Sequence, residues 1–190
     1  MRARNARNIA INSSKAIQIA AFFLDKTQNK RMPYLKLMKL MYLAERESLL
    51  RWGFPLTGDK LVSMKHGPVL STVLDYINGN KTEKNWNRII KTDKDAYDVL
   101  LTKEISYDEL SKAEKELLEE IWAKFGQMTQ WELRDWTHSN CKEWKDPAGS
   151  STPIEYEDIL KTGGYTKSEA KEIINDIKSF KRIDEIFASL

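Results

Sequence analysis

One stretch, from Lys36 to Val69, constrains the fold more than any other part of the chain. Pro33 suits the first turn of a helix and Gly53 suits its end, so the spacing predicts a helix between them. At the usual rise per residue this helix is about 28 Å long. Its apolar residues cover nearly the whole circumference, which is typical of a central helix packed by neighbours on two sides.

Shorter elements are expected on both sides of this helix. Leu61 and Val62 favour a strand, and Gly67 followed by Pro68 is interpreted as the start of another helix that ends near Gly79. The sequence therefore predicts helices over residues 14–28, 34–53 and 67–79, with Ser13 or Ser14 capping the first, and a strand within residues 57–65.

A β-hairpin is predicted between Trp86 and Leu101. Residues with high strand propensity occupy positions 86–90 and 96–101, and four polar residues at 92–95 separate them. This pattern favours two antiparallel strands joined by a loop of four or five residues.

The C-terminal half contains four Ser/Thr-x-x-Glu sequences, the pattern of a helix capping box. They are Ser111 with Glu114, Thr129 with Glu132, Thr152 with Glu155, and Thr166 with Glu169. The second of these helices is expected to end near Trp136, and residues 138–151 to be irregular. We expect a mainly α fold with a minor antiparallel β-hairpin: one compact helical domain over residues 13–190, after a basic N-terminal lead-in at residues 1–12.

Composition excludes several classes of protein. The single cysteine, Cys141, rules out an internal disulfide and fits a reducing compartment. No apolar run approaches the ~20 residues of a membrane span, so no membrane partner is expected. The net charge is only +3, but Lys and Arg strongly outnumber Asp and Glu in residues 1–53, and the balance reverses afterwards. A basic N-terminal part can attract phosphates or an acidic protein face, or it can simply be solvated.

Residues suited to catalysis are few. The two histidines are His66 and His138, and only His138 has a thiol close by in the sequence, at Cys141. No second Cys/His pair completes a zinc site, so we expect no catalytic residue, no metal and no cofactor. A small hydrolase or metalloenzyme built on His138 and Cys141 stays as a minor alternative.

Glu45 and the tryptophans raise separate questions. Glu45 lies within the apolar side of the central helix, so a Lys, Arg or Tyr partner is expected for its carboxylate. Trp52 and Trp122 lie on apolar faces and are expected in the core. Trp131, Trp136 and Trp144 are weighed as interface anchors against ordinary core packing, which is the default for tryptophan.

The order of the motifs resembles the Panacea domain, also called the SocA-like antitoxin domain. The motif residues are Lys36, Leu37, Lys39, Leu40, Tyr42 and Ala44, then Gly53, Pro55 and Leu56, then Gly67, Pro68 and Val69. Leu110-Ser111, Leu133 with Thr137-His138, and Trp144 extend the likeness, which is strongest over residues 14–146. Two positions depart from the family pattern: Glu143 replaces a proline, and His66 replaces an aromatic residue.

The resemblance implies a cytoplasmic antitoxin, bacterial or phage-associated, that neutralises a cognate toxin by direct binding. The motif residues themselves are interpreted as mainly structural, and Trp136, Thr137, His138 and Trp144 as candidates for partner binding. Two alternatives stay open: a phage or prophage protein that blocks a host defence effector, and a nucleic-acid-binding autoregulator. The latter would use Arg2, Arg4, Arg7, Lys30, Arg31, Lys36 and Lys39. Self-association is a further expectation if the partner face is apolar.

Overall fold

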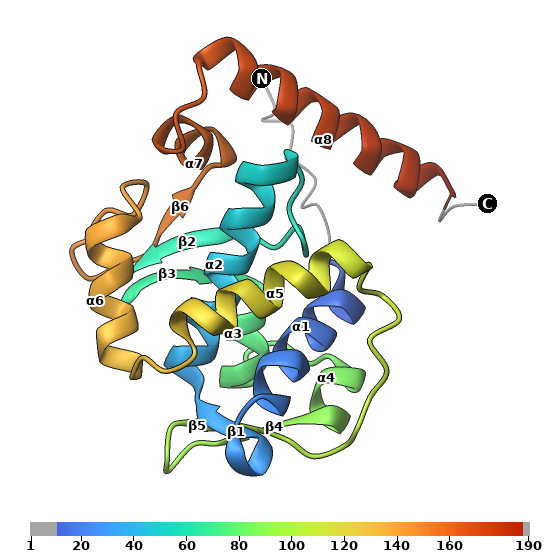
Figure 1. Cartoon of the computed structure of the whole chain (residues 1–190), viewed down its shortest axis with the longest axis vertical. Coiled ribbons are helices and arrows are strands. Elements are labelled where there is room, and N and C mark those ends of the chain that lie inside the picture. Colours follow the sequence, from blue (N-terminus) through green and yellow to red (C-terminus); the bar gives the residue numbers. More distant parts are fainter. Residues whose placement is uncertain (1–10, 188–190) are drawn as a thin grey trace, which may run out of the picture.

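The computed structural model describes residues 11–187, which form eight α-helices, one short 3-10 helix and two three-stranded antiparallel sheets (Figure 1). The expected class, mainly α with a minor antiparallel β part, is confirmed. The helices are α1 (Ser13–Asp25), η1 (Gln28–Lys30), α2 (Tyr34–Trp52), α3 (Ser71–Asn78), α4 (Lys84–Ile89), α5 (Lys112–Phe125), α6 (Gln130–Asn140), α7 (Tyr156–Thr162) and α8 (Lys167–Phe187). The strands are β1 (Arg31–Pro33), β2 (Leu61–Met64), β3 (Gly67–Leu70), β4 (Ile90–Asp93), β5 (Asp98–Leu101) and β6 (Thr152–Ile154).

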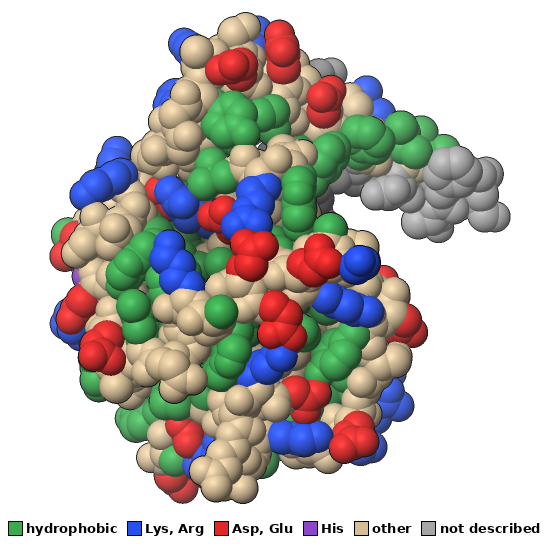
Figure 2. All heavy atoms as spheres, in the orientation of Figure 1, with side chains coloured by type: hydrophobic (Ala, Val, Ile, Leu, Met, Phe, Trp, Pro, Cys, Tyr) green, Lys and Arg blue, Asp and Glu red, His purple; other side chains and the backbone are tan. Residues whose placement is uncertain are grey.

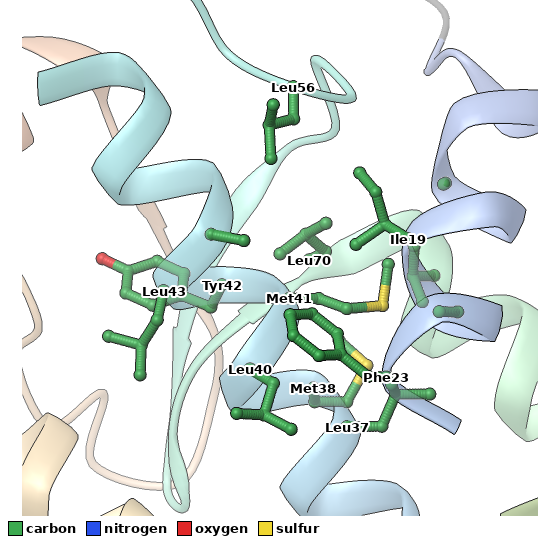
Figure 3. Packing of buried hydrophobic residues seen from close by; sticks show 14 of the residues in the cluster. Ile19, Phe23, Leu37, Met38, Leu40, Met41, Tyr42, Leu43, Leu56 and Leu70 are labelled. Atoms are coloured by element: carbon green, nitrogen blue, oxygen red, sulfur yellow. The ribbon is translucent and has the colours of Figure 1, made fainter. Parts of the chain in front are cut away.

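Helix α2 is the centre of the fold, as its all-round apolar pattern predicts. Helices α1, α5, α6 and α7 and strand β3 pack against it, and Figure 3 shows side chains of α2 meeting Ile19 and Phe23 of α1. Leu37, Leu40 and Tyr42 are fully buried. Gly53 ends the helix in the left-handed conformation, with φ of 70°, which glycine adopts without steric cost.

The predicted hairpin exists, but it is shorter than expected. Strands β4 and β5 pair with Ile90 opposite Leu101, and β1 adds a third strand on the far side of β5. Trp86, expected in a strand, lies in helix α4 and is almost fully buried. The side chain of Glu83 accepts a hydrogen bond from the backbone amide of Asn85, and this cap favours the helix over an extended chain.

A second sheet, in the order β3-β2-β6, was not predicted beyond its middle strand. The expectation that Gly67 and Pro68 begin a helix is wrong, because residues 67–70 pair with β2 as strand β3. Helix α3 starts only at Ser71. The buried carboxylate of Asp59 accepts hydrogen bonds from the amides of Thr72 and Val73 and so caps this helix from outside it.

Three of the four predicted capping boxes form, at Ser111, Thr129 and Thr166. The box at Thr152 is wrong, because residues 152–154 pair with β2 as strand β6. The next helix, α7, instead uses a box between Glu155 and Asp158. This sheet pairing overrides the local sequence preference.

Two helix boundaries also differ from expectation. Helix α6 continues to Asn140, so Thr137 and His138 are helical and not part of an irregular segment. Helix α1 is capped by the side chain of Asn12, which accepts from the amide of Lys15, and not by Ser13 or Ser14. The segment of residues 141–151 between α6 and β6 is irregular, as predicted.

The last two helices attach to the end of α2. Tyr165 donates a hydrogen bond from its hydroxyl to the carbonyl of Leu50, and the ring of Phe54 meets that of Phe180 edge-on at 5.2 Å between centroids. Beyond this contact α8 extends away from the rest of the molecule (Figure 1). Trp52, expected in the core, is 40% exposed near this junction, whereas Trp122 packs against the core.

Candidate functional site

Motif residues from three parts of the chain meet around the side chain of Lys39. This lysine is fully buried on α2, and its Nζ donates a hydrogen bond of 2.7 Å to the carbonyl oxygen of Pro68 on β3. Gly67 lies between Lys39 and the buried Thr137 of α6. We call Lys39, Gly67, Pro68, Thr137 and His138 the Lys39 cluster.

Gly67 is required at its position on two grounds. Its φ is +92°, a region that favours glycine. A Cβ atom there would also lie 2.9 Å from both Lys39 Nζ and Thr137 Oγ1, closer than van der Waals contact allows. The sequence Gly67-Pro68 therefore serves close packing between β3, α2 and α6.

The ammonium group of Lys39 has an unusual setting, because no carboxylate among residues 11–187 forms an ion pair with it. Burial disfavours the charged form and lowers the pKa of Lys39 to about 7. Near neutral pH both the ammonium form and the neutral amine form of Lys39 are therefore populated.

His138 and Trp144 form a stacked pair at the edge of the cluster. Their ring centroids are 3.8 Å apart with an interplanar angle of 6°, and the indole nitrogen of Trp144 donates to the carbonyl of Met64. Burial, with smaller contributions from Lys39 and Arg134, lowers the pKa of His138 and favours its neutral form. Its Nε2 is buried and has no hydrogen-bond partner among the described residues.

The four residues proposed for partner binding therefore have different surroundings. Thr137 is buried, and its hydroxyl donates to the carbonyl of Arg134. His138 and Trp144 are half-buried against each other, and Trp136 is half-buried against Phe125, with ring centroids 4.7 Å apart. Trp136 also lines a surface hollow, so this residue has both packing and a concave exposed side.

Glu143 has a structural role that the sequence did not reveal. Its buried carboxylate accepts hydrogen bonds from Tyr42 and Arg46 of α2, each at 2.7 Å, and from Thr162 of α7 at 2.9 Å. Burial alone would raise its pKa, but Arg46 and Tyr42 outweigh burial and hold the pKa below its ordinary value. The sequence signal was the departure from proline at this position, and the structure gives its consequence: Glu143 joins α2 to α7.

The thiol of Cys141, considered above as a nucleophile or metal ligand, is buried. Burial raises the pKa of this thiol to about 12, so it is protonated near neutral pH and is a poor nucleophile. Within residues 11–187 no group of three or more His, Cys, Asp or Glu side chains is arranged to hold a metal ion.

Glu45 is buried as predicted, and groups of the loop that follows α2 are among its partners. Its carboxylate accepts hydrogen bonds from the amides of Thr57 and Gly58 and from the Thr57 hydroxyl. Burial outweighs these hydrogen bonds and raises the pKa of Glu45 to about 7. The Glu45 carboxylate thus holds residues 57 and 58, in the loop after α2, against α2.

The remaining motif residues lie where a scaffold needs them. Most are buried, including Leu37, Leu40, Tyr42, Ala44, Leu56, Pro68 and Val69. Pro55 is half-buried in the turn after Gly53. Lys36 donates to the carbonyl of Gly126 and lies over the ring of Trp122, so its charge secures α5 to α2.

The basic residues considered for nucleic acid do not form a free cationic surface in the described part of the chain. Lys39 is buried, and Arg31 forms ion pairs with Asp93 and Asp98. Lys30 forms ion pairs with Asp25 and Glu104. Arg2, Arg4 and Arg7, with most of the proposed lead-in, lie outside the described residues.

Exposed apolar side chains gather on the last helix and beside its attachment to α2. Phe54, Phe180, Ile183 and Ile186 are between 40% and 55% exposed, and we call these four residues the α8 shelf. Figure 2 shows hydrophobic side chains along α8 where it extends beyond the rest of the molecule. Isolated apolar residues on a surface are ordinary, whereas a large contiguous apolar patch is typical of an interaction site.

No helix among residues 11–187 combines the length and apolar character needed to cross a membrane. A search of curated proteins and a search of solved structures gave no match.

A family model, described as the antitoxin SocA-like Panacea domain, matches residues 37–145. This segment runs from the first turn of α2 to just beyond Trp144 and contains the whole Lys39 cluster together with Glu143. Helices α7 and α8 lie outside the matched segment, and so do Phe180, Ile183 and Ile186 of the α8 shelf. The match covers more than half of the chain, and the chain belongs to the SocA-like antitoxin family defined by the Panacea domain.

Proposed function

We propose that this protein neutralises a cognate toxin by binding it directly, and that it acts without catalysis. The observation that carries the proposal is the family match over residues 37–145. A toxin is the partner that membership in an antitoxin family suggests.

The environment of the motif residues supports binding over chemistry. The Lys39 cluster is packed between α2, β3 and α6, and a methyl group at Gly67 would already collide with it. A substrate needs a cavity that reaches the reacting groups, and a buried amine in tight contact with its neighbours leaves no room for one. The cluster is thus suited to hold three elements in place.

The exposed side chains supply what a binding protein needs. Large apolar groups such as Phe180 and Ile183 lose contact with water when a partner covers them, and this burial drives association. The α8 shelf offers several such groups on one arm of the molecule.

The test is rescue of growth by co-expression. The product of the neighbouring reading frame is placed under an inducible promoter, and the present chain under a second one. We expect the neighbouring product alone to arrest growth, growth to return with the present chain, and the two proteins to purify together. The matched control is Leu37→Asp, which places a carboxylate in the core and should not rescue.

Arrest by the neighbouring product with no recovery and no complex would contradict the proposal. Recovery without a complex would mean that neutralisation does not act through direct binding.

A further inference from the structure

A groove lies where α2, α5 and α6 meet, inside the part of the chain that the family model covers. Its volume is about 170 Å³. An enclosed cavity of roughly 150 Å³ is enough to hold benzene in an engineered protein, so the groove has room for one apolar side chain of a partner. Figure 2 shows charged side chains of both signs around hydrophobic ones in this region.

The floor and the rim of the groove have different chemistry. Leu43, Ile121 and Phe125 are buried beneath it, and the half-buried ring of Trp136 forms a wall. Arginine, lysine and glutamate side chains stand around this floor, namely Arg46, Glu47, Arg51, Glu120 and Lys124. A ligand that fits must therefore place an apolar group on the floor of the groove and a charged group at its rim.

The existing ion pairs determine which charge is left for a ligand. Arg51 already binds two carboxylates, those of Glu47 and Glu120. Lys124 forms no ion pair with any described carboxylate, and its Nζ lies 5.1 Å from the ring centroid of Phe125 and 5.5 Å from that of Trp136. The unmatched charge at the aromatic end of the groove is thus positive.

Arg46 adds a second donor to the lining of the groove. Its Nε is held by Glu143, and no residue in the described range accepts a hydrogen bond from its terminal nitrogens. The guanidinium is held at Nε, and Arg46 is one of the residues that line the groove. A carboxylate can accept from an arginine edge and a nearby ammonium together, which is stronger than either contact alone.

We propose that this groove binds a segment of the partner protein in which an Asp or Glu stands next to a large apolar residue. The apolar side chain covers Ile121 and Phe125 and packs on Trp136, and the carboxylate meets Lys124 and Arg46. The inference rests on the proposed function, because it takes the partner to be a protein that this chain captures. It places this contact within the segment that the family model matches, separate from the α8 shelf.

A library of random 12-residue peptides displayed on phage, panned on the purified full chain, tests the proposal. We expect enrichment of peptides with an acidic residue within two positions of a large apolar one. Panning on Lys124→Glu should replace acidic residues by Lys or Arg at that place. A fluorescently labelled selected peptide should bind Lys124→Glu and Trp136→Ala at least about tenfold more weakly than the unchanged chain. Lys112→Glu, the same charge change on an exposed residue of the same helix, should leave affinity unchanged.

Several results would overturn the proposal. They are the absence of an acidic–apolar pattern, the same pattern on Lys124→Glu, and equal loss of affinity in Lys112→Glu. Displacement of the peptide by inorganic phosphate or by single-stranded RNA would reassign the groove to phosphate groups.

Co-expression separates this proposal from the proposed function. Rescue by the unchanged chain and equal rescue by a folded Lys124→Glu would remove the groove and leave the antitoxin role intact. Failure of the unchanged chain to rescue would remove the antitoxin role, whichever peptides are selected.

Discussion

The Lys39 cluster and the α8 shelf are opposites in burial and in sequence signal. Lys39, Gly67 and Thr137 belong to recognisable motifs, and they are packed so tightly that a methyl group at Gly67 would collide with two of them. Phe180 and Ile183 belong to no motif, lie outside the family match, and are about half exposed. The residues that identify the family thus define its scaffold, while the residues free to touch a partner lie elsewhere.

This contrast separates stability from binding. A substitution at a buried motif residue or at Glu143 should change the free energy of unfolding, and binding only through folding. A substitution on the α8 shelf should change binding and affect stability less. Each prediction below can break that separation.

The largest effect on stability is expected at Glu143. Replacement by alanine removes the acceptor of Tyr42, Arg46 and Thr162 and leaves the arginine charge unmatched in a mostly buried place. Breaking a buried pair in this way costs about 3–5 kcal/mol, so Glu143→Ala should lower the free energy of unfolding by about that amount. Urea denaturation followed by circular dichroism measures it.

Glu143→Gln is the matched control, because it keeps an acceptor and removes only the charge. The free energy of unfolding should fall less in Glu143→Gln than in Glu143→Ala. A loss below about 1 kcal/mol for Glu143→Ala would show that the link between α2 and α7 contributes little, and would weaken the contrast.

An intermediate effect is expected from the titration of Lys39. Its pKa is about 7 in the folded protein and 10.5 ordinarily, so between these values the unfolded chain binds more protons. The free energy of unfolding therefore rises with pH in this window, by at most about 1.4 kcal/mol per pH unit from this one group. Below pH 7 Lys39 is protonated in both states and adds no slope.

Lys39→Met keeps most of the side-chain volume and removes the titrating group. The stability difference between the unchanged chain and this variant should thus grow in favour of the unchanged chain from pH 7 to pH 9. Urea midpoints at pH 7, 8 and 9 measure the difference. Parallel curves for the two proteins would mean that Lys39 is not perturbed by its burial.

The smallest effect on stability is expected on the α8 shelf. Phe180→Ser with Ile183→Ser replaces two half-exposed side chains and removes the ring contact between Phe180 and Phe54. An aromatic pair contributes about 0.5–1.5 kcal/mol, so the free energy of unfolding should fall by about 1 kcal/mol. Thermal unfolding measures it. A large drop in melting temperature would show that the shelf is part of the core and not a free surface.

Local sequence patterns predicted those parts of the fold that depend on neighbouring residues. The left-handed stop at Gly53 and the capping boxes at Ser111 and Thr129 each rest on contacts within a few positions of the chain. The errors arose where distant partners decided the outcome. Residues 67–70 and 152–154 became strands because β2 lies between them, and this pairing overrides local preference.

The candidate site shows the same division. The motif order identified the residues of the Lys39 cluster, but their meeting around one buried ammonium depends on packing between α2, β3 and α6. The role of Glu143 could not be predicted, since its partners are 19 to 101 positions away in the chain. The exposure of Phe180 and Ile183 could not be predicted either. The apolar periodicity of α8 does not show at which residue the rest of the molecule stops packing against the helix.

The most direct test of this separation is the affinity of the neighbouring reading frame's product for two folded variants, measured by isothermal titration calorimetry. One is Phe180→Ser with Ile183→Ser, and the other is Lys39→Met, each shown to be folded by circular dichroism. The prediction is at least about a tenfold loss of affinity for the shelf variant, or about 1.4 kcal/mol, and unchanged affinity for Lys39→Met. Unchanged binding by the shelf variant, together with lost binding by folded Lys39→Met, would contradict the account.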